Sequence, residues 1–588
     1  MKDYSEKIIE FKSYPISERF DYLVRYWKVE ESVKNNNTIQ LVGKFSKSKT
    51  KDKNGNDYGY FVNIRNLNGD ILYYPFGLGE VQVWAPFRPI LQQSEFWLIN
   101  LTIDDSDYSE NNPCALRLAD FTFGQPKNKF KDKIEKEKLI RKIFKETGYT
   151  KTDAKNEANA LRSIMGDLYT ETERFIFELL QNADDQPNEN KKVKTSLRLL
   201  QGNLIFTHNG KPFDKDDVVS ICSIGDSTKK NDSDKIGYKG IGFKSVFSDS
   251  NTVYINSGNF SFSFDKESFL YNKEENMDEV PWQIKPIWAE MYRYPKSVQE
   301  DNWFFKSPVG IALSIPSKKI DEYAEIIPQL LNEPRFVLFL KNIYQLSYCD
   351  IYGKEYTIQK TINENVCEIS SNDEIKSSWI TQDFVIDVPE ETKDLIQDDK
   401  LVPRKLKEAN KTKVSFAIIF KDNKIVKVKK EQSILFTYLP TKVKDFEFPF
   451  LVNADFLTTA SRESIHYKNL WNRFLFSCIG EKLVDWAIML SENVSNYLEV
   501  LPKQLLSTED ETKKILAICF NESYIKALKE KSFILNSKGY LSPQNEIVVD
   551  KSGLTEIIDE DTFYKFIGNE RHLPNDAIKD IILNSAPL

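Results

Sequence analysis

The chain reads Glu178-Leu-Leu-Gln-Asn182-Ala-Asp-Asp185 at its most informative stretch. A carboxylate and a carboxamide four residues apart lie on one face of a helix. The inward stripe of that helix would consist of Phe175, Ile176, Leu179 and Leu180. We therefore expect a polar line of Glu178, Asn182 and Asp185 beside a packed face, although such a line more often marks a solvated helix surface.

Two glycine-containing segments downstream change that balance. A predicted strand, 203–208, runs into Asn209-Gly210, and the chain later reads Gly237-Tyr-Lys-Gly240-Ile-Gly242-Phe-Lys244. Glycines spaced in this way before an apolar helix let backbone N–H groups approach an anion at the positive end of the helix dipole. The sequence therefore predicts a phosphate-binding loop that opens a helix.

In this order, the three segments resemble the GHKL ATPases, and most closely the heat-shock-chaperone-like ATPase domain of the sacsin and NO VEIN type. The strings ELLQNADD and IGYKGIGFKSVF carry the likeness. The resemblance implies an α/β sandwich of the GHKL (Bergerat) type that binds ATP and Mg²⁺. It covers residues 161–264 strongly and extends more loosely to about residue 483.

A second match lies in 454–464, which includes Ser461-Arg462-Glu463. This stretch resembles the middle-domain loop of the ninety-kilodalton heat-shock chaperone, whose arginine reaches back to the γ-phosphate. The resemblance implies that Arg462 belongs to a transducer-like β-α-β domain coupled to the nucleotide domain. The alternative is a surface salt bridge between Arg462 and Glu463.

The resemblance also implies roles for individual residues. Glu178 would orient or deprotonate the attacking water, and Asn182 would ligate magnesium through its carbonyl oxygen. Lys244 would lie near the mouth of the site, and the polar residues 226–234 fit a mobile lid. The expected nucleotide-binding residues are Asn182, Asp185, His208, Asn209, Gly210, Ser227, Thr228, Lys229, Gly237, Gly240, Ile241, Gly242, Phe243 and Lys244.

Two positions depart from the family pattern. The aspartate that accepts from the adenine amino group is replaced by His208 or Asn209, and the Gly-Thr of the closing strand appears as Gly310-Ile311. Adenine selectivity is therefore in question, whereas phosphate binding is less affected. Asn209 could still accept a hydrogen bond from adenine through its amide oxygen.

The composition is that of an ordered chain of several domains. The 588 residues are 40% apolar and 29% charged, and the net charge of −7 argues against wholesale nucleic-acid coating. We find neither a run of about 18 uncharged apolar residues nor an apolar signal-peptide core, so we expect a cytoplasmic protein with no membrane contact. Six scattered cysteines suggest buried free thiols rather than disulfides or a zinc site.

The expected fold class is α+β. We predict a β-rich N-terminal domain at 1–125, a charged linker or helix at 126–151, the nucleotide domain at 152–318, the transducer at 319–490 and a mixed α/β region at 491–588. The N-terminal domain resembles an OB-like barrel, in which Tyr58, Tyr60 and Phe61 beside a 44–53 loop would stack bases. These rings equally suit a barrel core or rim.

Two functions remain open at this point. The first is an ATPase with nucleotide-driven lid closure and homodimerisation, in a chaperone-like or antiviral-defence setting with a protein client or defence partner. The second is a nucleotide-gated nucleic-acid clamp with little intrinsic hydrolysis. Its contacts would be the N-terminal barrel and a basic stretch, which a solvated hairpin explains equally well. The stretch comprises Arg404, Lys405, Lys407, Lys411, Lys413, Lys424, Lys427, Lys429 and Lys430.

Overall fold

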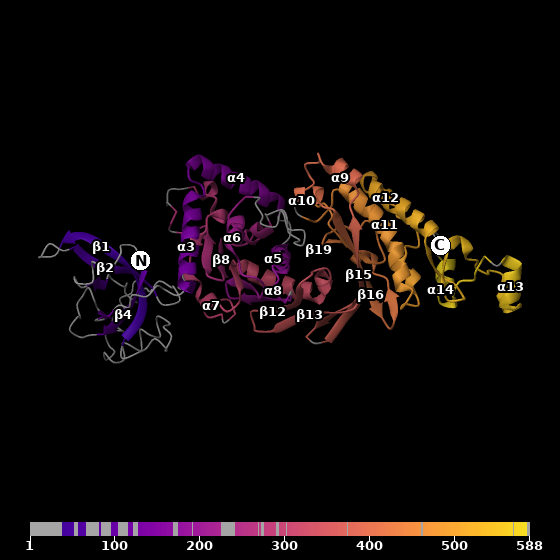
Figure 1. The fold of residues 1–588 in the computed structure, drawn as a ribbon, viewed down its shortest axis with the longest axis horizontal. Coiled ribbons are helices and arrows are strands. Elements are labelled where there is room, and N and C mark those ends of the chain that lie inside the picture. The colour runs from indigo at the N-terminus through magenta and orange to yellow at the C-terminus, as the bar shows by residue number, and fades with distance from the viewer. Residues whose placement is uncertain are drawn as a thin grey trace. The chain divides into compact units, whose positions relative to one another are not determined.

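The computed structural model has two compact units (Figure 1). It describes residues 38–51, 57–65, 81–83, 96–103, 116–120, 128–168, 174–190, 192–224, 242–268, 270–271, 276–289, 293–301, 303–372, 374–459, 462–568 and 570–584. The first unit comprises residues 1–146, 258–263 and 286–295, and the second comprises 147–257, 264–285 and 296–588. Helices and a large mixed sheet confirm the α+β class. The domain boundaries expected from the sequence stay predictions.

The first unit contains a five-stranded antiparallel sheet in the order β3-β2-β1-β4-β5. Its strands are β1 Thr38–Lys51, β2 Asp57–Arg65, β3 Val81–Val83, β4 Phe96–Ile103 and β5 Leu116–Asp120. The expected loop at 44–53 is wrong up to residue 51, because that segment pairs with β2 and β4 as part of β1. Tyr58, Tyr60 and Phe61 lie in β2, but their side chains lie outside what the structure describes.

Helix α3 (Asn128–Glu146) completes this unit with β10 (Ile287–Trp288), which pairs with residues 262–263 of β9 (Phe260–Asp265). Glu137 of α3 accepts from Arg65 of β2 at 2.8 Å and also pairs with Arg141 one turn along the helix. The lysine-rich sequence that we predicted as a linker or helix is therefore a helix. The ion pairs of Glu137 with Arg65 and Arg141 attach one face of this helix to β2.

The α5 module occupies the first part of the second unit, residues 147–257 and 296–332. Its strands follow the order β8-β11-β7-β6, and the sheet continues through β12. The strands are β6 Val193–Leu200, β7 Asn203–His208, β8 Thr252–Ser257 and β11 Val309–Ser314. The helices are α4 Lys151–Leu168, α5 Arg174–Asp184, α6 Lys215–Ile221, α7 Lys296–Gln299 and α8 Ser317–Asn332, with the 3₁₀ helix η5 at Gly242–Phe247. The predicted helix around Glu178 and the predicted strand 203–208 are confirmed as α5 and β7, and Gly310 and Ile311 lie in a strand, β11.

The α11 module, residues 343–490, extends the same sheet, because β12 pairs in parallel with β6. The order continues β12-β13-β14-β15-β16-β20-β18-β19, with β17 on β16. The strands are β12 Ile343–Cys349, β13 Glu355–Asn363, β14 Val366–Ser371, β15 Glu374–Asp387, β16 Lys411–Lys421, β17 Lys424–Val426, β18 Leu435–Thr437, β19 Leu439–Pro440 and β20 Leu451–Ala454. The helices are α9 Glu390–Ile396, α10 Arg404–Lys407 and α11 Leu470–Leu490.

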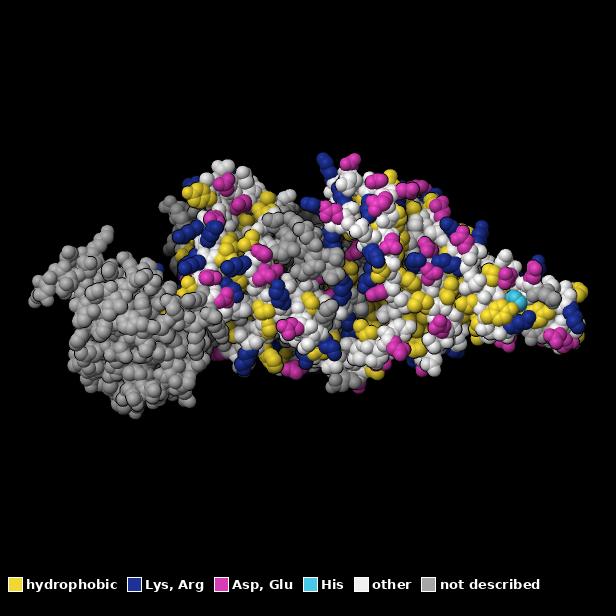
Figure 2. Space-filling view, viewed as in Figure 1, with side chains coloured by type: hydrophobic (Ala, Val, Ile, Leu, Met, Phe, Trp, Pro, Cys, Tyr) yellow, Lys and Arg dark blue, Asp and Glu magenta, His cyan; other side chains and the backbone are white. Residues whose placement is uncertain are grey.

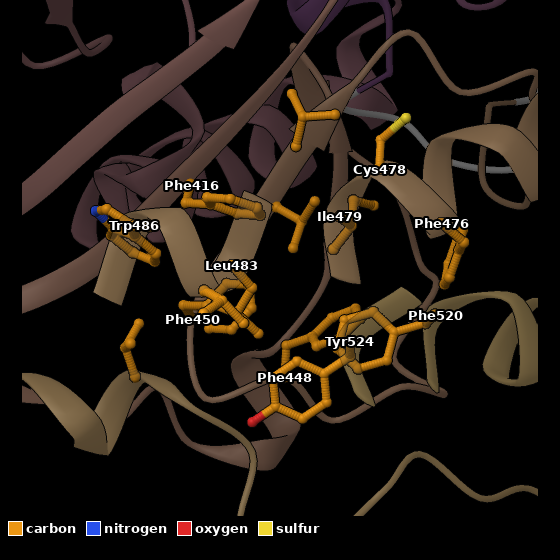
Figure 3. Packing of buried hydrophobic residues seen from close by; sticks show 14 of the residues in the cluster. Phe416, Phe448, Phe450, Phe476, Cys478, Ile479, Leu483, Trp486, Phe520 and Tyr524 are labelled. Carbon is orange, nitrogen blue, oxygen red and sulfur yellow. The ribbon is translucent and has the colours of Figure 1, made fainter. Parts of the chain in front are cut away.

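An aromatic core fixes α11 on the sheet and α12 on α11 (Figures 1 and 3). Phe416 of β16 stacks on Trp486 of α11 at 5.1 Å, and Phe448 meets Phe520 of α12 at 5.2 Å. Large rings bury 150–250 Å² each, so they supply much of the stabilisation of such a core. Helix α11 is buried around most of its circumference, whereas α12 buries one apolar face and exposes most of its charged residues.

The C-terminal region is mixed, as predicted. It contains α12 Glu511–Glu530, β21 Ser532–Leu535, β22 Leu541–Pro543, α13 Glu560–Ile567 and α14 Asp576–Leu583. Three of the described 3₁₀ helices also lie in this region: η11 Tyr497–Val500, η12 Gln544–Glu546 and η13 Leu554–Glu556. Others lie earlier in the described chain: η6 Met277–Glu279, η7 Trp282–Ile284, η9 Pro334–Val337 and η10 Lys430–Gln432. Within the described ranges no helix combines the length and apolar content that crossing a bilayer requires.

Candidate functional site

Helix α5 carries the polar line that the sequence predicts. Its apolar side chains Phe175, Ile176, Leu179 and Leu180 are buried, which fixes the rotation of the helix on the sheet. Glu178 and Asp185 are buried as well, while Asn182 is half-buried. The line is therefore not a solvated surface, and its carboxylates need partners.

Glu178 meets two arginines. Its Oε1 lies 3.5 Å from Nη2 of Arg174, one turn earlier on α5, and 3.4 Å from Nε of Arg462. Arg462 also donates through Nη1 to Oε1 of Gln181. The structure thus brings the predicted carboxylate and the predicted arginine together from distant parts of the chain. The sequence analysis did not identify Arg174 or Gln181 as site residues. Their spacing could have indicated them, because each lies about one helical turn from Glu178 on α5.

The loop that carries Arg462 has a tight shape. The backbone N–H of Arg462 donates to the Thr459 carbonyl at 3.0 Å, and Thr458 bridges Ile465. Arg462 has a φ of +56°, a conformation that few non-glycine residues adopt. Glu463 pairs with Lys442 at 3.1 Å, so the alternative salt bridge between Arg462 and its neighbour is not what the structure shows.

Gly242, the last glycine of the predicted loop, packs directly on Glu178. A Cβ at Gly242 would lie 2.1 Å from Oε2 of Glu178, which is closer than real Cβ atoms come to any atom. The position therefore requires glycine for as long as the carboxylate occupies this place. Ser227, Thr228, Lys229, Gly237, Gly240, Ile241 and the 226–234 segment lie outside the described residues.

The helix expected after Gly242 is a six-residue 3₁₀ helix, η5. A 3₁₀ helix of this length aligns fewer peptides than the expected helix and so has a weaker dipole, and the phosphate contact stays a prediction. Phe243 is half-buried and stands edge-on to Phe247 at 6.2 Å.

Lys244 does not lie at an open mouth, and that expectation is corrected. Its ammonium is buried, donates to the carbonyls of Ile221 and Gln283, and lies over the rings of Phe247 and Phe264. Burial lowers the pKa of Lys244 from 10.5 to about 8. The side chain was misplaced because a lysine beside a glycine loop resembles a phosphate ligand in sequence, whereas here the carbonyls occupy its donors.

Side chains that accept from backbone N–H groups hold the Asn-Gly turn after β7. His208 is buried, and its Nδ1 accepts from the Gly210 N–H at 3.1 Å. Burial lowers the pKa of His208 to about 3, so the ring is neutral near pH 7. Oδ1 of Asn209 accepts from the Lys194 N–H at 2.7 Å, and a Cβ at Gly210 would lie 2.2 Å from the Gln186 carbonyl.

Strand β11, which contains Gly310 and Ile311, pairs with β7 and β8. Gly310 lies opposite Thr207, and its missing side chain leaves room for the Phe304 carbonyl, which would be 2.7 Å from a Cβ. Ile311 is buried. An isoleucine at this place offers no hydroxyl, so the contact made by the family's threonine is absent from this side chain.

The basic stretch in the α11 module is largely neutralised. Arg404 pairs with Glu408 at 2.6 Å, Lys413 with Asp383 at 2.7 Å, and Lys427 with Glu499. Lys411 and Lys430 also have acidic partners. Basic and acidic side chains are intermixed over the module on the face drawn in Figure 2. These pairs suit a solvated surface, and the nucleic-acid contact stays a prediction.

The described cysteines are Cys222, Cys349, Cys367, Cys478 and Cys519, all free thiols, and three of them are buried. Burial raises the pKa of the Cys222 and Cys478 thiols to about 12. Among the described residues there is no group of three or more His, Cys, Asp or Glu that would hold a metal ion by itself.

The chain resembles known proteins over the part of the site formed by α5, β7 and η5. Residues 155–362 match the family model described as the Sacsin domain. The chain is 24% identical over 366 residues to "Protein NO VEIN" of Arabidopsis thaliana, which covers 58% of this chain and 12% of that protein. It is 32% identical over 112 residues to "Sacsin" of Homo sapiens, which covers 17% of this chain and 2% of that protein. The chain thus matches only a small part of either relative, and the sequence resemblance to the sacsin and NO VEIN type is confirmed.

A solved structure titled "Crystal Structure of N terminal domain of a DNA repair protein" overlaps half of the chain and 86% of that structure. The TM-score is 0.28 and the identity 10%, values too low to support an argument about fold or function.

Proposed function

We propose that this chain is a magnesium-dependent ATPase with the GHKL fold, in which α5, the turn after β7 and the glycine segment ending at Gly242 form the nucleotide site. The supporting observation is the meeting of three separately recognised segments at one carboxylate. Glu178 of α5 contacts Arg462 of the α11 module and lies directly against Gly242. The Sacsin-domain match covers two of these segments.

In this proposal, Glu178 orients the attacking water and takes its proton. Phosphoryl transfer depends mainly on positioning and on compensation of charge, and a positioned base contributes roughly two to four orders of magnitude in rate. The burial of Glu178 and its two arginine contacts hold the carboxylate in one place. A fixed base is what this step requires.

Asn182 is the residue that would hold Mg²⁺. In nucleotide sites this ion takes only one or two protein oxygens and completes its shell with waters and phosphate oxygens. The half-buried amide of Asn182 lies one turn from Glu178 on the same helix, which fits that requirement. Magnesium would supply neutralisation of the phosphate charge.

Arg462 compensates the charge of the transferring phosphoryl group. A guanidinium is charged at all relevant pH values and offers a rigid fork to phosphate oxygens. Its contacts with Glu178 and Gln181 already place it on the polar line of α5. Turnover would close the 226–234 lid, bring two copies together and drive remodelling of a protein client or defence partner.

The experiment measures ATP turnover and nucleotide binding by the same preparations. We expect Glu178→Ala to lose about two to four orders of magnitude in turnover while it still binds nucleotide. We expect Arg462→Ala to lower turnover severely with a modest effect on affinity, and Arg462→Lys to rescue it poorly. Glu463→Gln, which breaks the neighbouring pair with Lys442, is the matched control. Wild-type turnover in Glu178→Ala would refute the assignment, as would no binding of ATP, GTP or ADP with magnesium.

A further inference from the structure

The last residue of α5 is tied to a strand more than 150 residues away. Oδ2 of Asp184 accepts from the Lys341 N–H at 2.8 Å, and Oδ1 accepts from the N–H groups of Asn342 and Ile343 at 2.6 and 2.8 Å. The Asn342 amide donates back to the Asp184 carbonyl at 2.7 Å. Hydrogen bonds to a carboxylate are roughly twice as strong as neutral ones. The three bonds to the Asp184 carboxylate and the one to its backbone carbonyl therefore hold the end of α5 on the start of β12.

The chain just before these amides is held from the opposite side. The buried ammonium of Lys360, on β13, donates to the carbonyls of Val337 (3.1 Å) and Leu340. An anion thus takes the amides and a cation takes the carbonyls of one short turn, which satisfies both buried charges. We call residues 334–343 the junction segment.

Aromatic contacts continue the junction segment to both modules. Phe336 stands edge-on to Phe177 of α5 at 5.6 Å, and Phe339 stands edge-on to Phe436 of β18 at 4.9 Å. The ammonium of Lys341 lies over the Tyr438 ring at 5.2 Å. The segment therefore contacts the helix that carries Glu178 on one side and the β18–β19 hairpin on the other.

That hairpin leads to Arg462. The Tyr438 N–H donates to Oδ1 of Asn453 on β20, the strand that precedes the Arg462 loop. Just after β19, the Lys442 N–H donates to the Glu463 carbonyl at 2.8 Å. The contacts thus form a closed ring from α5 through the junction segment, the hairpin and the Arg462 loop, back to Glu178.

We propose that Asp184 is a positioning residue, which sets the register between α5 and the α11 module so that Arg462 reaches Glu178. The effect of Asp184 on turnover rests on the proposed ATPase function, whereas its effect on the position of Arg462 does not. The four hydrogen bonds of Asp184 involve none of Glu178, Asn182 or Asp185. Its effect on the position of Arg462 is therefore transmitted through the ring of contacts.

The first test reads position without activity. In the full chain, Gln181→Cys and Arg462→Cys place thiols at two residues whose side-chain ends meet, and a short bifunctional thiol reagent measures how fast the two positions are crosslinked, with the product identified by mass spectrometry among the native cysteines. We expect Asp184→Ala to slow this reaction at least about tenfold, the factor that corresponds to about 1.4 kcal/mol. Asp184→Asn, which keeps the shape, should slow it less. An unchanged rate in both variants overturns the proposal.

The control is Asp550→Asn. That carboxylate also accepts several bonds, from Ser552 and Thr555, but lies in the C-terminal region. We expect its crosslinking rate to equal that of the parent. A similar slowing in both Asp→Asn variants would show a general loss of stability and would overturn the specific role.

The second test uses turnover. If Asp184 acts by placing Arg462, Asp184→Asn lowers turnover in the parent but adds no further loss in the Arg462→Ala background. Losses that multiply in the double variant overturn the proposal. Should no preparation hydrolyse ATP, the function proposed above fails, while the crosslinking rates still decide the role of Asp184.

Discussion

Gly242→Ala tests the contact on which the candidate site depends. The new methyl carbon would lie 2.1 Å from Oε2 of Glu178, whereas real Cβ atoms keep at least 3.0 Å. The carboxylate must therefore move by about 0.9 Å. It ends a flexible side chain, but its burial and its two arginine contacts oppose the shift, so we expect a cost within the overpacking range of roughly 1–3 kcal/mol. A misplacement of about 1 Å also costs on the order of 10² in rate when it affects a catalytic group.

Urea unfolding in a double-mutant cycle with Glu178→Ala separates this clash from other effects. Truncation at Glu178 removes the atom that the new methyl group would strike, so we expect Gly242→Ala to destabilise the parent by about 1–3 kcal/mol and the Glu178→Ala background by much less. ATP turnover of Gly242→Ala should fall about 10²-fold. Equal destabilisation in both backgrounds would refute the placement of Glu178 against the glycine.

The other predictions concern charge, base selectivity and the N-terminal sheet. The pKa of His208 is lowered to about 3 when folded, so the unfolded chain binds the extra proton between pH 6.5 and about 3, and stability falls by several kcal/mol as the pH drops through that window. His208→Asn, whose Oδ1 can accept from Gly210, should unfold with a weaker acid dependence; an identical dependence would contradict the neutral ring. The pKa of Lys244 is lowered to about 8, so stability relative to Lys244→Met should rise from pH 8 toward pH 10.5, and a flat difference in urea unfolding would argue against the buried ammonium. Because Ile311 lacks a hydroxyl and Asn209 is engaged by Lys194, competition titrations should show weaker ATP-over-GTP discrimination than in the chaperone family, by about 1 kcal/mol per lost bond. If Tyr58, Tyr60 and Phe61 stack bases, replacing all three by Ala in the full chain should abolish salt-sensitive anisotropy with a labelled oligonucleotide, and no such binding by the parent would remove this role.

Local patterns predicted the elements of the site but not all of their contacts. The helix at α5 and the strands β7 and β11 follow from hydrophobic period and turn residues, because these signals lie within a few neighbouring residues. The meeting of Arg462 with Glu178 was expected only from the family resemblance, since no local pattern links residues so far apart. Lys244 was misplaced for the same reason, because the carbonyls that hold it belong to Ile221 and Gln283.

Asp184 shows the limit most clearly. In the sequence it is one of two adjacent aspartates at the end of a helix. The family resemblance of ELLQNADD indicated Asp185, and not Asp184, as a site residue. The amides that Asp184 accepts from start a strand that no helix pattern can indicate. A buried carboxylate must find donors, but which distant backbone provides them is decided by the parallel pairing of β12 with β6.

The glycines of the site have a packing explanation besides their expected contact with phosphate. Gly210 leaves room for the Gln186 carbonyl, and Gly310 leaves room for Phe304. Gly242 makes room for the carboxylate of Glu178 itself, so the loop and the base cannot vary independently. A larger residue at Gly242 would displace the group that the proposed reaction requires. The glutamate on α5 and the glycine at the start of η5 are therefore linked by a direct contact.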